Sequence, residues 1–182
     1  MLLKKTFYFV RHGETDHNRN YLCAGSQIDV PLNKTGRIQA KSLREKVSFL
    51  SINKVICSPL KRTVQTAVLA TSPHPLIIEH DMRECDLGDF EGKPVPEFIQ
   101  HIEANSSEIP FPNEESRNDL SKRVLAAVNK FLQAHGDNLL FVSHGMVYWS
   151  LLEITGISFH HIPNAGIMQF KPQKDFWAVS EL

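Results

Sequence analysis

The sequence has few cysteines and no long apolar run, and each shortage excludes a class of protein. Its three cysteines, Cys23, Cys57 and Cys85, are an odd number and form no C-x-x-C pair. A reducing compartment therefore fits better than a disulfide framework, and the spacing does not suit a structural zinc site. The longest apolar runs, residues 7–10 and 139–142, fall far below the roughly 20 residues that span a membrane. We therefore expect a cytoplasmic protein without a membrane span.

An excess of charge of one sign is also lacking. The 182 residues contain 20 Lys+Arg against 20 Asp+Glu, which gives a formal net charge of zero. Such a chain has no long-range field that would gather nucleic acid or an anionic membrane, so we expect neither as a partner. Any anion that the protein binds must instead meet a local cluster of cations.

Common nucleotide-binding and hydrolase motifs are absent as well. The sequence contains no G-x-x-x-x-G-K-[ST], G-x-S-x-G, H-E-x-x-H or G-x-G-x-x-G pattern. Residues 57–62 resemble a thiol phosphatase loop, but four residues separate the Cys from the Arg where five are needed, and the loop has no glycine. The sequence therefore predicts no nucleotide cofactor, and the chemistry considered below needs no metal.

Predicted strands and helices alternate along the chain. We expect strands at residues 6–10, 54–57, 76–79, 138–143, 166–170 and 176–180. Helices are predicted after Thr35, after Ser58-Pro59, over residues 120–131 and from about Met146, with Thr35 and Ser58 as N-caps. This alternation favours an α/β fold with a mostly parallel sheet, and the length suits one domain over residues 1–182.

One segment departs from the alternation. Residues 94–116 contain four prolines around a short predicted helix at 97–103, and we interpret them as a small flap or cap. The segment has no Lys or Arg, and its acidic residues are Glu97, Glu103, Glu108, Glu114 and Glu115.

Charged and polar residues follow the predicted strands. Arg11 and His12 come after the first strand, Arg62 after the second and His144 after the fourth, and Glu84 lies a few residues past the third. In α/β folds the functional site lies beyond the carboxyl ends of the strands. We therefore expect these five side chains to meet, although each of them taken alone also fits a structural role.

The chemistry of this set points to a phosphoryl group. Guanidinium groups pair with phosphate oxygens in a bidentate manner, and the start of a helix after Ser58-Pro59 adds unpaired backbone N–H groups. A neutral imidazole is a competent nucleophile toward phosphorus, and a carboxyl with a raised pKa can protonate the departing oxygen. The residues alone do not decide which histidine attacks.

Ordered motifs extend this set over about residues 6–170. They are Arg11-His12-Gly13-Glu14-Thr15, Asn18, Gly25, Pro31-Leu32, Gly36, Gln39-Ala40, Ser58-Pro59-Leu60-x-Arg62-Thr63, Arg83-Glu84, Phe90-Glu91-Gly92 and Val142-Ser143-His144-Gly145. Together they resemble the histidine phosphatase superfamily, in the branch that contains phosphoglycerate mutase-like phosphatases. The resemblance implies a three-layer α/β/α sandwich with a mostly parallel central sheet.

The resemblance also implies a role for each residue. His12 would carry the phosphoryl group as a covalent intermediate, and Glu84 would donate a proton to the leaving group. The phosphoryl oxygens would be held by Arg11, Asn18, Gly25, Arg62 and His144. No cofactor or metal is implied.

The same pocket can pass the phosphoryl group to water or back to a sugar acid. A mutase that acts on phosphoglycerate needs cations in the cap, and residues 94–116 have none, so we expect a phosphatase that acts on a small phosphorylated metabolite. Phosphoglycerate mutase chemistry and a non-catalytic module that binds phosphorylated ligands remain the alternatives. The oligomeric state, monomer or homodimer, stays open.

Overall fold

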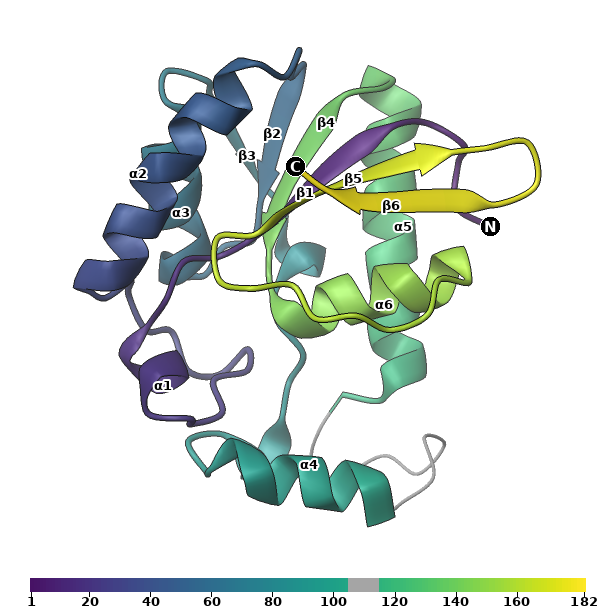
Figure 1. Cartoon of the computed structure of the whole chain (residues 1–182). Helices are drawn as coiled ribbons and strands as arrows, with labels where there is room; N and C mark the ends of the chain where they lie inside the picture. Colours follow the sequence, from purple (N-terminus) through teal and green to yellow (C-terminus); the bar gives the residue numbers. More distant parts are fainter. Residues whose placement is uncertain (105–114) are drawn as a thin grey trace.

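A computed structural model describes residues 1–104 and 115–182, which contain a six-stranded sheet with helices on both faces (Figure 1). In spatial order β3-β2-β4-β1-β5-β6, the strands are β3 (Leu76–Ile78), β2 (Lys54–Cys57), β4 (Leu139–Ser143), β1 (Phe7–Arg11), β5 (Ile167–Pro172) and β6 (Trp177–Glu181). The first four are parallel, and β5 and β6 are antiparallel to their neighbours. The predicted mostly parallel sheet is confirmed.

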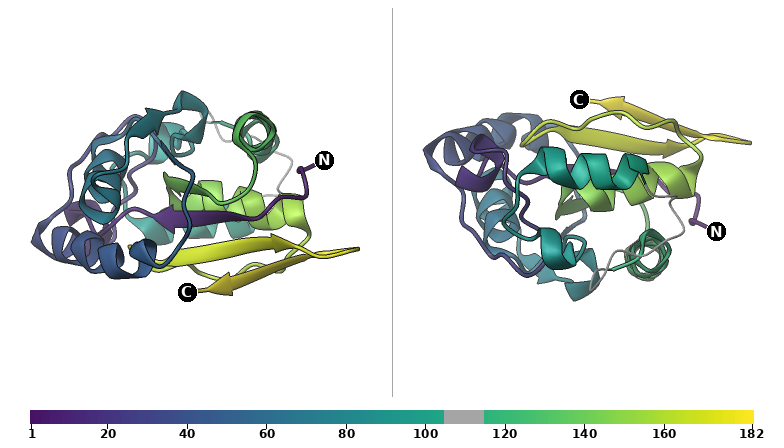
Figure 2. Two further views of the ribbon diagram at one scale, coloured as in Figure 1. Left: turned by 90° about the horizontal axis from the view of Figure 1, so that it is seen from above. Right: turned by 90° about the horizontal axis from the view of Figure 1, so that it is seen from below.

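Helices pack on each face of the sheet. The α-helices are α1 (Asp16–Arg19), α2 (Lys34–Ser48), α3 (Lys61–Thr71), α4 (Val95–Ala104), α5 (Arg117–His135) and α6 (Gly145–Thr155), and two short 3-10 helices lie at η1 (His80–Met82) and η2 (Gly88–Phe90). Of these, α2, α3, α5 and α6 cover the sheet. In β1, Phe7 and Phe9 join the core shared with α5 and α6, whereas Tyr8 and Val10 join the core shared with α2 and α3. In Figures 1 and 2, α2 and α3 lie next to each other and are separate from α5 and α6. The three-layer sandwich is confirmed.

The central strands fix where the polar residues emerge. Every residue of β4 is buried, as expected for a parallel strand that is covered on both faces. Phe7 of β1 stacks on Phe170 with ring centroids 4.7 Å apart and meets the edge of Phe141 at 5.6 Å. The register pairs Arg11 with Ser143, so the carboxyl ends of β1 and β4 lie at the same level.

Both predicted N-caps are wrong. Asn33 caps α2, because its Oδ1 accepts a hydrogen bond from the backbone N–H of Gly36 at 2.8 Å, and Thr35 lies inside the first turn. Helix α3 begins at Lys61 with no side-chain cap, since the hydroxyl of Ser58 instead lies 2.7 Å from a ring nitrogen of His144. A tertiary contact therefore overrides the local capping signal at Ser58.

The 94–116 segment contains α4, which is longer than the predicted helix at 97–103. Figure 1 shows α4 apart from the sheet, below the carboxyl ends of the parallel strands. Its Phe98 packs against Phe90 with ring centroids 5.5 Å apart. Of the acidic residues in this segment, Glu108 and Glu114 lie outside the described residues. None of the helices in the described part of the chain is long and apolar enough to cross a membrane.

The capping of α2 gives a test of the fold. We expect Asn33→Ala to lower the free energy of unfolding by about 1 kcal/mol, because it removes a side-chain cap from α2. Thr35→Ala is the matched control, and it should leave stability unchanged or slightly raised because alanine favours the helix. Urea denaturation measures both variants. Equal losses in the two variants would contradict the assignment of Asn33 as the cap.

Candidate active site

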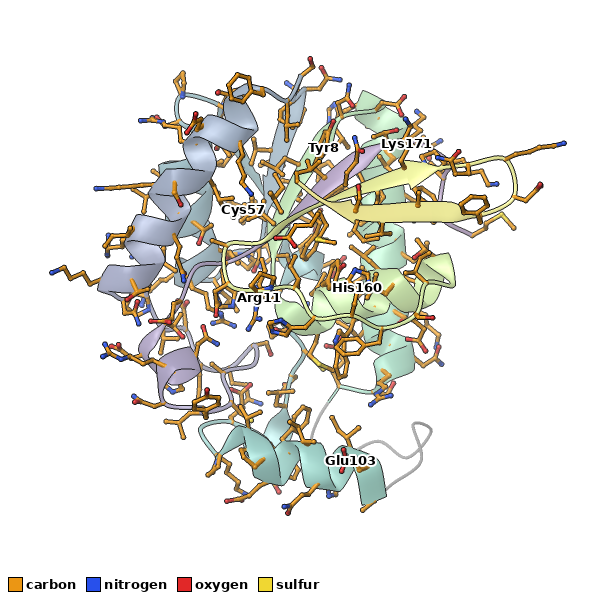
Figure 3. All side chains as sticks on the ribbon, in the orientation of Figure 1. Tyr8, Arg11, Cys57, Glu103, His160 and Lys171 are labelled. Carbon is orange, nitrogen blue, oxygen red and sulfur yellow. The ribbon has the colours of Figure 1, made fainter. Side chains whose placement is uncertain are left out.

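The structure brings the five predicted side chains together beyond the carboxyl ends of β1 and β4. The rings of His12 and His144 meet edge to face, with centroids 5.3 Å apart. A methyl group placed on Gly145 would lie 3.8 Å from Nε of Arg11 and 4.0 Å from Oε2 of Glu84. The fifth residue is Arg62, in the first turn of α3. Its charge influences His12, Glu84 and His144, and it is the most buried arginine, with only 1% of its surface exposed. We call the space that these residues bound the anion pocket. Figure 3 shows Arg11 between the strands and α4.

His12 is held as a neutral imidazole with one free nitrogen. Its Nδ1 lies 2.8 Å from the carbonyl oxygen of Gly13, which can only accept, so the ring proton is on Nδ1. Burial, with the charges of Arg62 and Arg11, holds the pKa of His12 well below its usual value. The other nitrogen, Nε2, therefore keeps a lone pair that is available for attack.

The backbone around His12 is fixed by three elements. The N–H of His12 donates to the carbonyl of Ser143 in β4 at 3.0 Å, and the N–H of Gly13 donates to the hydroxyl of Thr66 in α3 at 3.0 Å. A Cβ on Gly13 would lie 2.5 Å from the carbonyl oxygen of Gly36 in α2, so only glycine fits there. The loop that carries His12 is thus clamped between β4, α2 and α3.

Backbone carbonyls bind both outer nitrogens of one pocket arginine and one outer nitrogen of the other. Arg62 donates from its two terminal nitrogens to the carbonyls of Ala24, Gly25 and Ile28 at 2.9–3.1 Å. Arg11 donates to the carbonyl of Ile162 at 2.8 Å. The expected free guanidinium forks are therefore partly occupied by the protein itself, which fixes the position of each positive charge.

Three buried polar atoms of the anion pocket have no partner. They are Nε of Arg11, Nε of Arg62 and Nδ1 of His144, and no other buried side-chain nitrogen or oxygen of the described residues lacks a hydrogen bond. Buried polar groups are almost always hydrogen-bonded in proteins, so orphaned atoms need an explanation. Their concentration on three neighbouring residues, two of them cationic, indicates a site for an anion.

His144 is also neutral in this environment. Burial, and next the positive charge of Arg62, hold the pKa of His144 well below its usual value. Its Nε2 lies 2.7 Å from the hydroxyl oxygen of Ser58, which orients the ring. The sequence predicted that His144 belongs to the site but gave no sign of this contact with Ser58.

The pKa of Glu84 is shifted in the opposite direction to those of the two histidines. Burial raises the pKa of its carboxyl, although backbone N–H groups and the charge of Arg62 act against this shift. Its Oε1 accepts from the N–H of Cys85 at 3.0 Å, and its Oε2 accepts from the N–H of Met146 in the first turn of α6 at 3.4 Å. A buried carboxyl with a raised pKa is suited to hold and deliver a proton.

A partly buried ion pair that the sequence did not reveal holds the backbone of Glu84 and of the residues just before it. The guanidinium of Arg123 in α5 binds the carboxylate of Glu115 through two contacts, at 2.5 and 2.7 Å. The same guanidinium donates to the carbonyls of Asp81, Arg83 and Glu84 at 2.6, 2.9 and 3.1 Å. We call this arrangement the Arg123 clamp. Residues 115 and 123 have no local pattern that announces such long-range contacts.

Asn164 is a second residue that the sequence analysis missed. Its side-chain N–H group donates to the carbonyl of His12 at 3.1 Å and to Oδ1 of Asn18 at 3.2 Å. That oxygen of Asn18 also accepts from the backbone N–H of Thr15 at 3.1 Å. Asn18 therefore keeps its own amide N–H groups as donors, and Asn164 ties its position to that of His12.

Gly25, a predicted ligand residue, uses both of its backbone groups inside the protein. Its N–H donates to Oε2 of Glu91 at 2.9 Å, and its carbonyl accepts from Arg62 at 2.9 Å. A Cβ at this position would lie 2.5 Å from the carbonyl oxygen of Cys85. The structure thus gives Gly25 a role in supporting Arg62. In the described part of the chain, no three His, Cys, Asp or Glu side chains are grouped to hold a metal ion.

The fold and the anion pocket define the class first: an α/β/α protein whose buried cationic pocket, beyond the carboxyl ends of its parallel strands, is suited to an oxyanion. Comparison with known proteins then gives the family. Residues 7–182 match the histidine phosphatase superfamily (branch 1), and the chain belongs to this superfamily.

Relatives include proteins named for two reactions. The protein named uncharacterized phosphatase PhoE of Bacillus subtilis (strain 168) is 33% identical over 180 residues, covering 94% of this chain and 91% of that protein. The probable phosphoglycerate mutase GpmB of Enterobacter sp. (strain 638) is 31% identical over 189 residues, covering 95% and 87%. A solved mycobacterial glucosyl-3-phosphoglycerate phosphatase with VO3 superimposes with a TM-score of 0.84 over 97% of each chain. Its 20% identity supports the fold alone.

The burial of the Glu84 carboxyl predicts that the folded protein becomes less stable as the pH rises. Because burial raises the pKa of Glu84 in the folded protein, folding is favoured while this group is protonated and loses that advantage as the pH rises through its folded pKa. Glu84→Gln cannot ionise, so its melting temperature should exceed that of the wild type at about pH 7.5 and approach it at about pH 4.

Thermal unfolding at the two pH values measures this difference. Glu97→Gln, at an exposed position of α4, is the matched control and should follow the wild type at both pH values. A Glu84→Gln variant that is less stable than the wild type at about pH 7.5 would contradict the assignment of burial as the dominant influence on Glu84.

Proposed function

We propose that this protein is a phosphatase that hydrolyses a phosphate monoester of a small metabolite through a phosphohistidine on His12. One observation carries the proposal. The unpartnered polar atoms of the anion pocket, on Arg11, Arg62 and His144, belong to the residues that meet around His12, which is neutral and has a free Nε2. Unpaired donors suit an anionic phosphoryl group, and the free nitrogen suits attack on its phosphorus.

The first step transfers the phosphoryl group to the protein. Nε2 of His12 attacks phosphorus, and the bond from phosphorus to the ester oxygen breaks as the new P–N bond forms. Glu84 gives its proton to the departing oxygen, so the alcohol leaves neutral. Arg11, Arg62 and His144, with the amide of Asn18, stabilise the charge on the transferring oxygens, which is the largest contribution in most phosphoryl transfers.

The second step returns the protein to its starting state. Water attacks phosphorus, the P–N bond breaks, and the carboxylate of Glu84 takes a proton from the water. Orthophosphate leaves, and both His12 and Glu84 regain their initial protonation. The reaction is balanced with water as its sole co-reactant, and none of its steps calls for a metal or cofactor.

We favour water over a sugar acid as the acceptor because of charge. Residues 94–116, which we treat as the cap of a single catalytic domain, contain no Lys or Arg to bind the carboxylate of phosphoglycerate. Some relatives are named as probable phosphoglycerate mutases, so mutase chemistry is the alternative reaction. Conversion of 3- to 2-phosphoglycerate that depends on bisphosphoglycerate would overturn this preference, and tight phosphate binding without turnover of any ester would favour a binding module.

The covalent step is tested at His12. We expect His12→Ala to lower the turnover of 4-nitrophenyl phosphate by a factor of at least about 10³, because no other residue replaces the nucleophile. His135→Ala, an exposed histidine at the end of α5, is the matched control and should retain activity. Rapid quenching with radiolabelled substrate should leave acid-labile label on the wild type and none on His12→Ala. Substantial turnover by His12→Ala would exclude the phosphohistidine.

The proton donor is tested with a series of leaving groups. For Glu84→Gln we expect kcat/KM to fall by about 100-fold or more with alkyl phosphates and far less with 4-nitrophenyl phosphate, whose phenolate needs little protonation. Arg123→Ala removes the clamp and should show the same dependence on the leaving group to a smaller degree.

Lys130→Ala is the matched control for the clamp. It breaks another ion pair of α5, between Lys130 and Glu79 at 2.6 Å, and Lys130 is not a residue of the anion pocket. Its dependence on the leaving group should equal that of the wild type. If Arg123→Ala lowers kcat/KM equally for all esters, the Arg123 clamp serves stability and does not position Glu84.

A further inference from the structure

A cavity of about 400 Å³ lies between α5 and α6, beside the anion pocket. We call it the α5–α6 cavity. Its lining includes the apolar side chains of Leu120, Met146, Trp149 and Phe159 and two charged side chains, Arg117 and Glu153. This volume is in the range of small-molecule sites, which are mostly apolar with a few polar groups. Nothing in the proposed phosphoryl transfer uses these residues.

Met146 connects the cavity to the proposed chemistry. It lines the cavity, and its backbone N–H donates to Oε2 of Glu84 at 3.4 Å. In the proposed function, on which this inference rests, Glu84 protonates the ester oxygen, and the alcohol part of the substrate begins at that oxygen.

An aromatic pair forms the rim of the cavity. The rings of Trp149 and Phe159 meet nearly at right angles, with centroids 4.4 Å apart. Phe159 is 58% exposed, which is unusual for so large an apolar side chain that already touches another ring. Aromatic faces and edges of this kind attract another flat ring.

The polar groups of the lining do not call for a charged ligand. Arg117 and Glu153 carry opposite charges, so together they add no net charge to the cavity. The hydroxyl of Ser150 donates to that of Ser121 at 3.0 Å, and Ser121 donates to Glu153 at 3.4 Å. The two serine hydroxyls and Glu153 are therefore hydrogen-bonded to one another within the lining.

We propose that the α5–α6 cavity is the subsite for the alcohol part of the substrate, and that the preferred substrates are phosphate monoesters of uncharged, flat aromatic alcohols. The phosphate occupies the anion pocket, the ester oxygen lies at Glu84, and the ring enters the cavity past Met146 to contact Phe159. This assignment also disfavours phosphoglycerate, whose alcohol part carries a carboxylate.

Phenyl phosphate and 2-naphthyl phosphate test the subsite, because their leaving groups are of similar acidity and differ by one ring. We expect the wild type to hydrolyse the naphthyl ester with kcat/KM about tenfold higher, mainly through a lower KM. Phe159→Ala should bring this ratio close to one, because it lowers kcat/KM for the naphthyl ester more than for the phenyl ester. Because Phe159 is exposed, its removal should not unfold the protein.

Phe176→Ala is the matched control, since Phe176 is 62% exposed and lies between β5 and β6. It should keep the wild-type ratio. A ratio near one in the wild type, or a high ratio that survives in Phe159→Ala, overturns the subsite but leaves the phosphatase intact. Release of phosphate from neither ester by the wild type would instead overturn the proposed function, so the two failures are distinct.

Discussion

The burial of two guanidinium groups beside two imidazoles is the constraint on which the site depends. Removing an arginine from water is costly, and here backbone carbonyls offset the cost where carboxylates often do, at Ala24, Gly25 and Ile28 for Arg62. Because carbonyls carry no full charge, the positive field of Arg62 and Arg11 persists in the pocket. That field and burial together hold both histidines neutral, and a neutral imidazole is the form that can attack.

The same burial has the opposite effect on the carboxyl. It lowers the pKa of His12 and raises that of Glu84, because in each case the charged form is disfavoured. One environment thus favours the unprotonated form of His12 and the protonated form of Glu84, and such separation of pKa values is how paired groups acquire distinct roles. The Arg123 clamp adds geometry to this chemistry, since it fixes the backbone at Glu84 from a helix on the far side of the loop.

Local signals predicted the strands and the site, and long-range contacts account for what was missed. The strand at residues 54–57 was predicted with its observed bounds, because a short apolar run with a turn after it is a local pattern. The five side chains of the anion pocket follow from the rule that sites lie beyond strand ends. In contrast, Ser58 contacts His144 across 86 positions, and Asn164 contacts the carbonyl of His12 across 152. No local pattern encodes pairings of this kind, so the cap at Ser58 was wrong and Asn164 was missed.

The division between the anion pocket and the α5–α6 cavity has a consequence for specificity. Residues of the pocket are largely buried, polar or charged, and tied to the backbone of several elements, so a substitution there alters the chemistry and the fold together. Phe159, in contrast, is exposed and belongs to a connecting segment, where side chains are replaced at little cost to stability. Under the proposed function, a chain with no net charge can therefore keep one cationic centre for the phosphoryl group and change the alcohol that it accepts by altering the cavity alone.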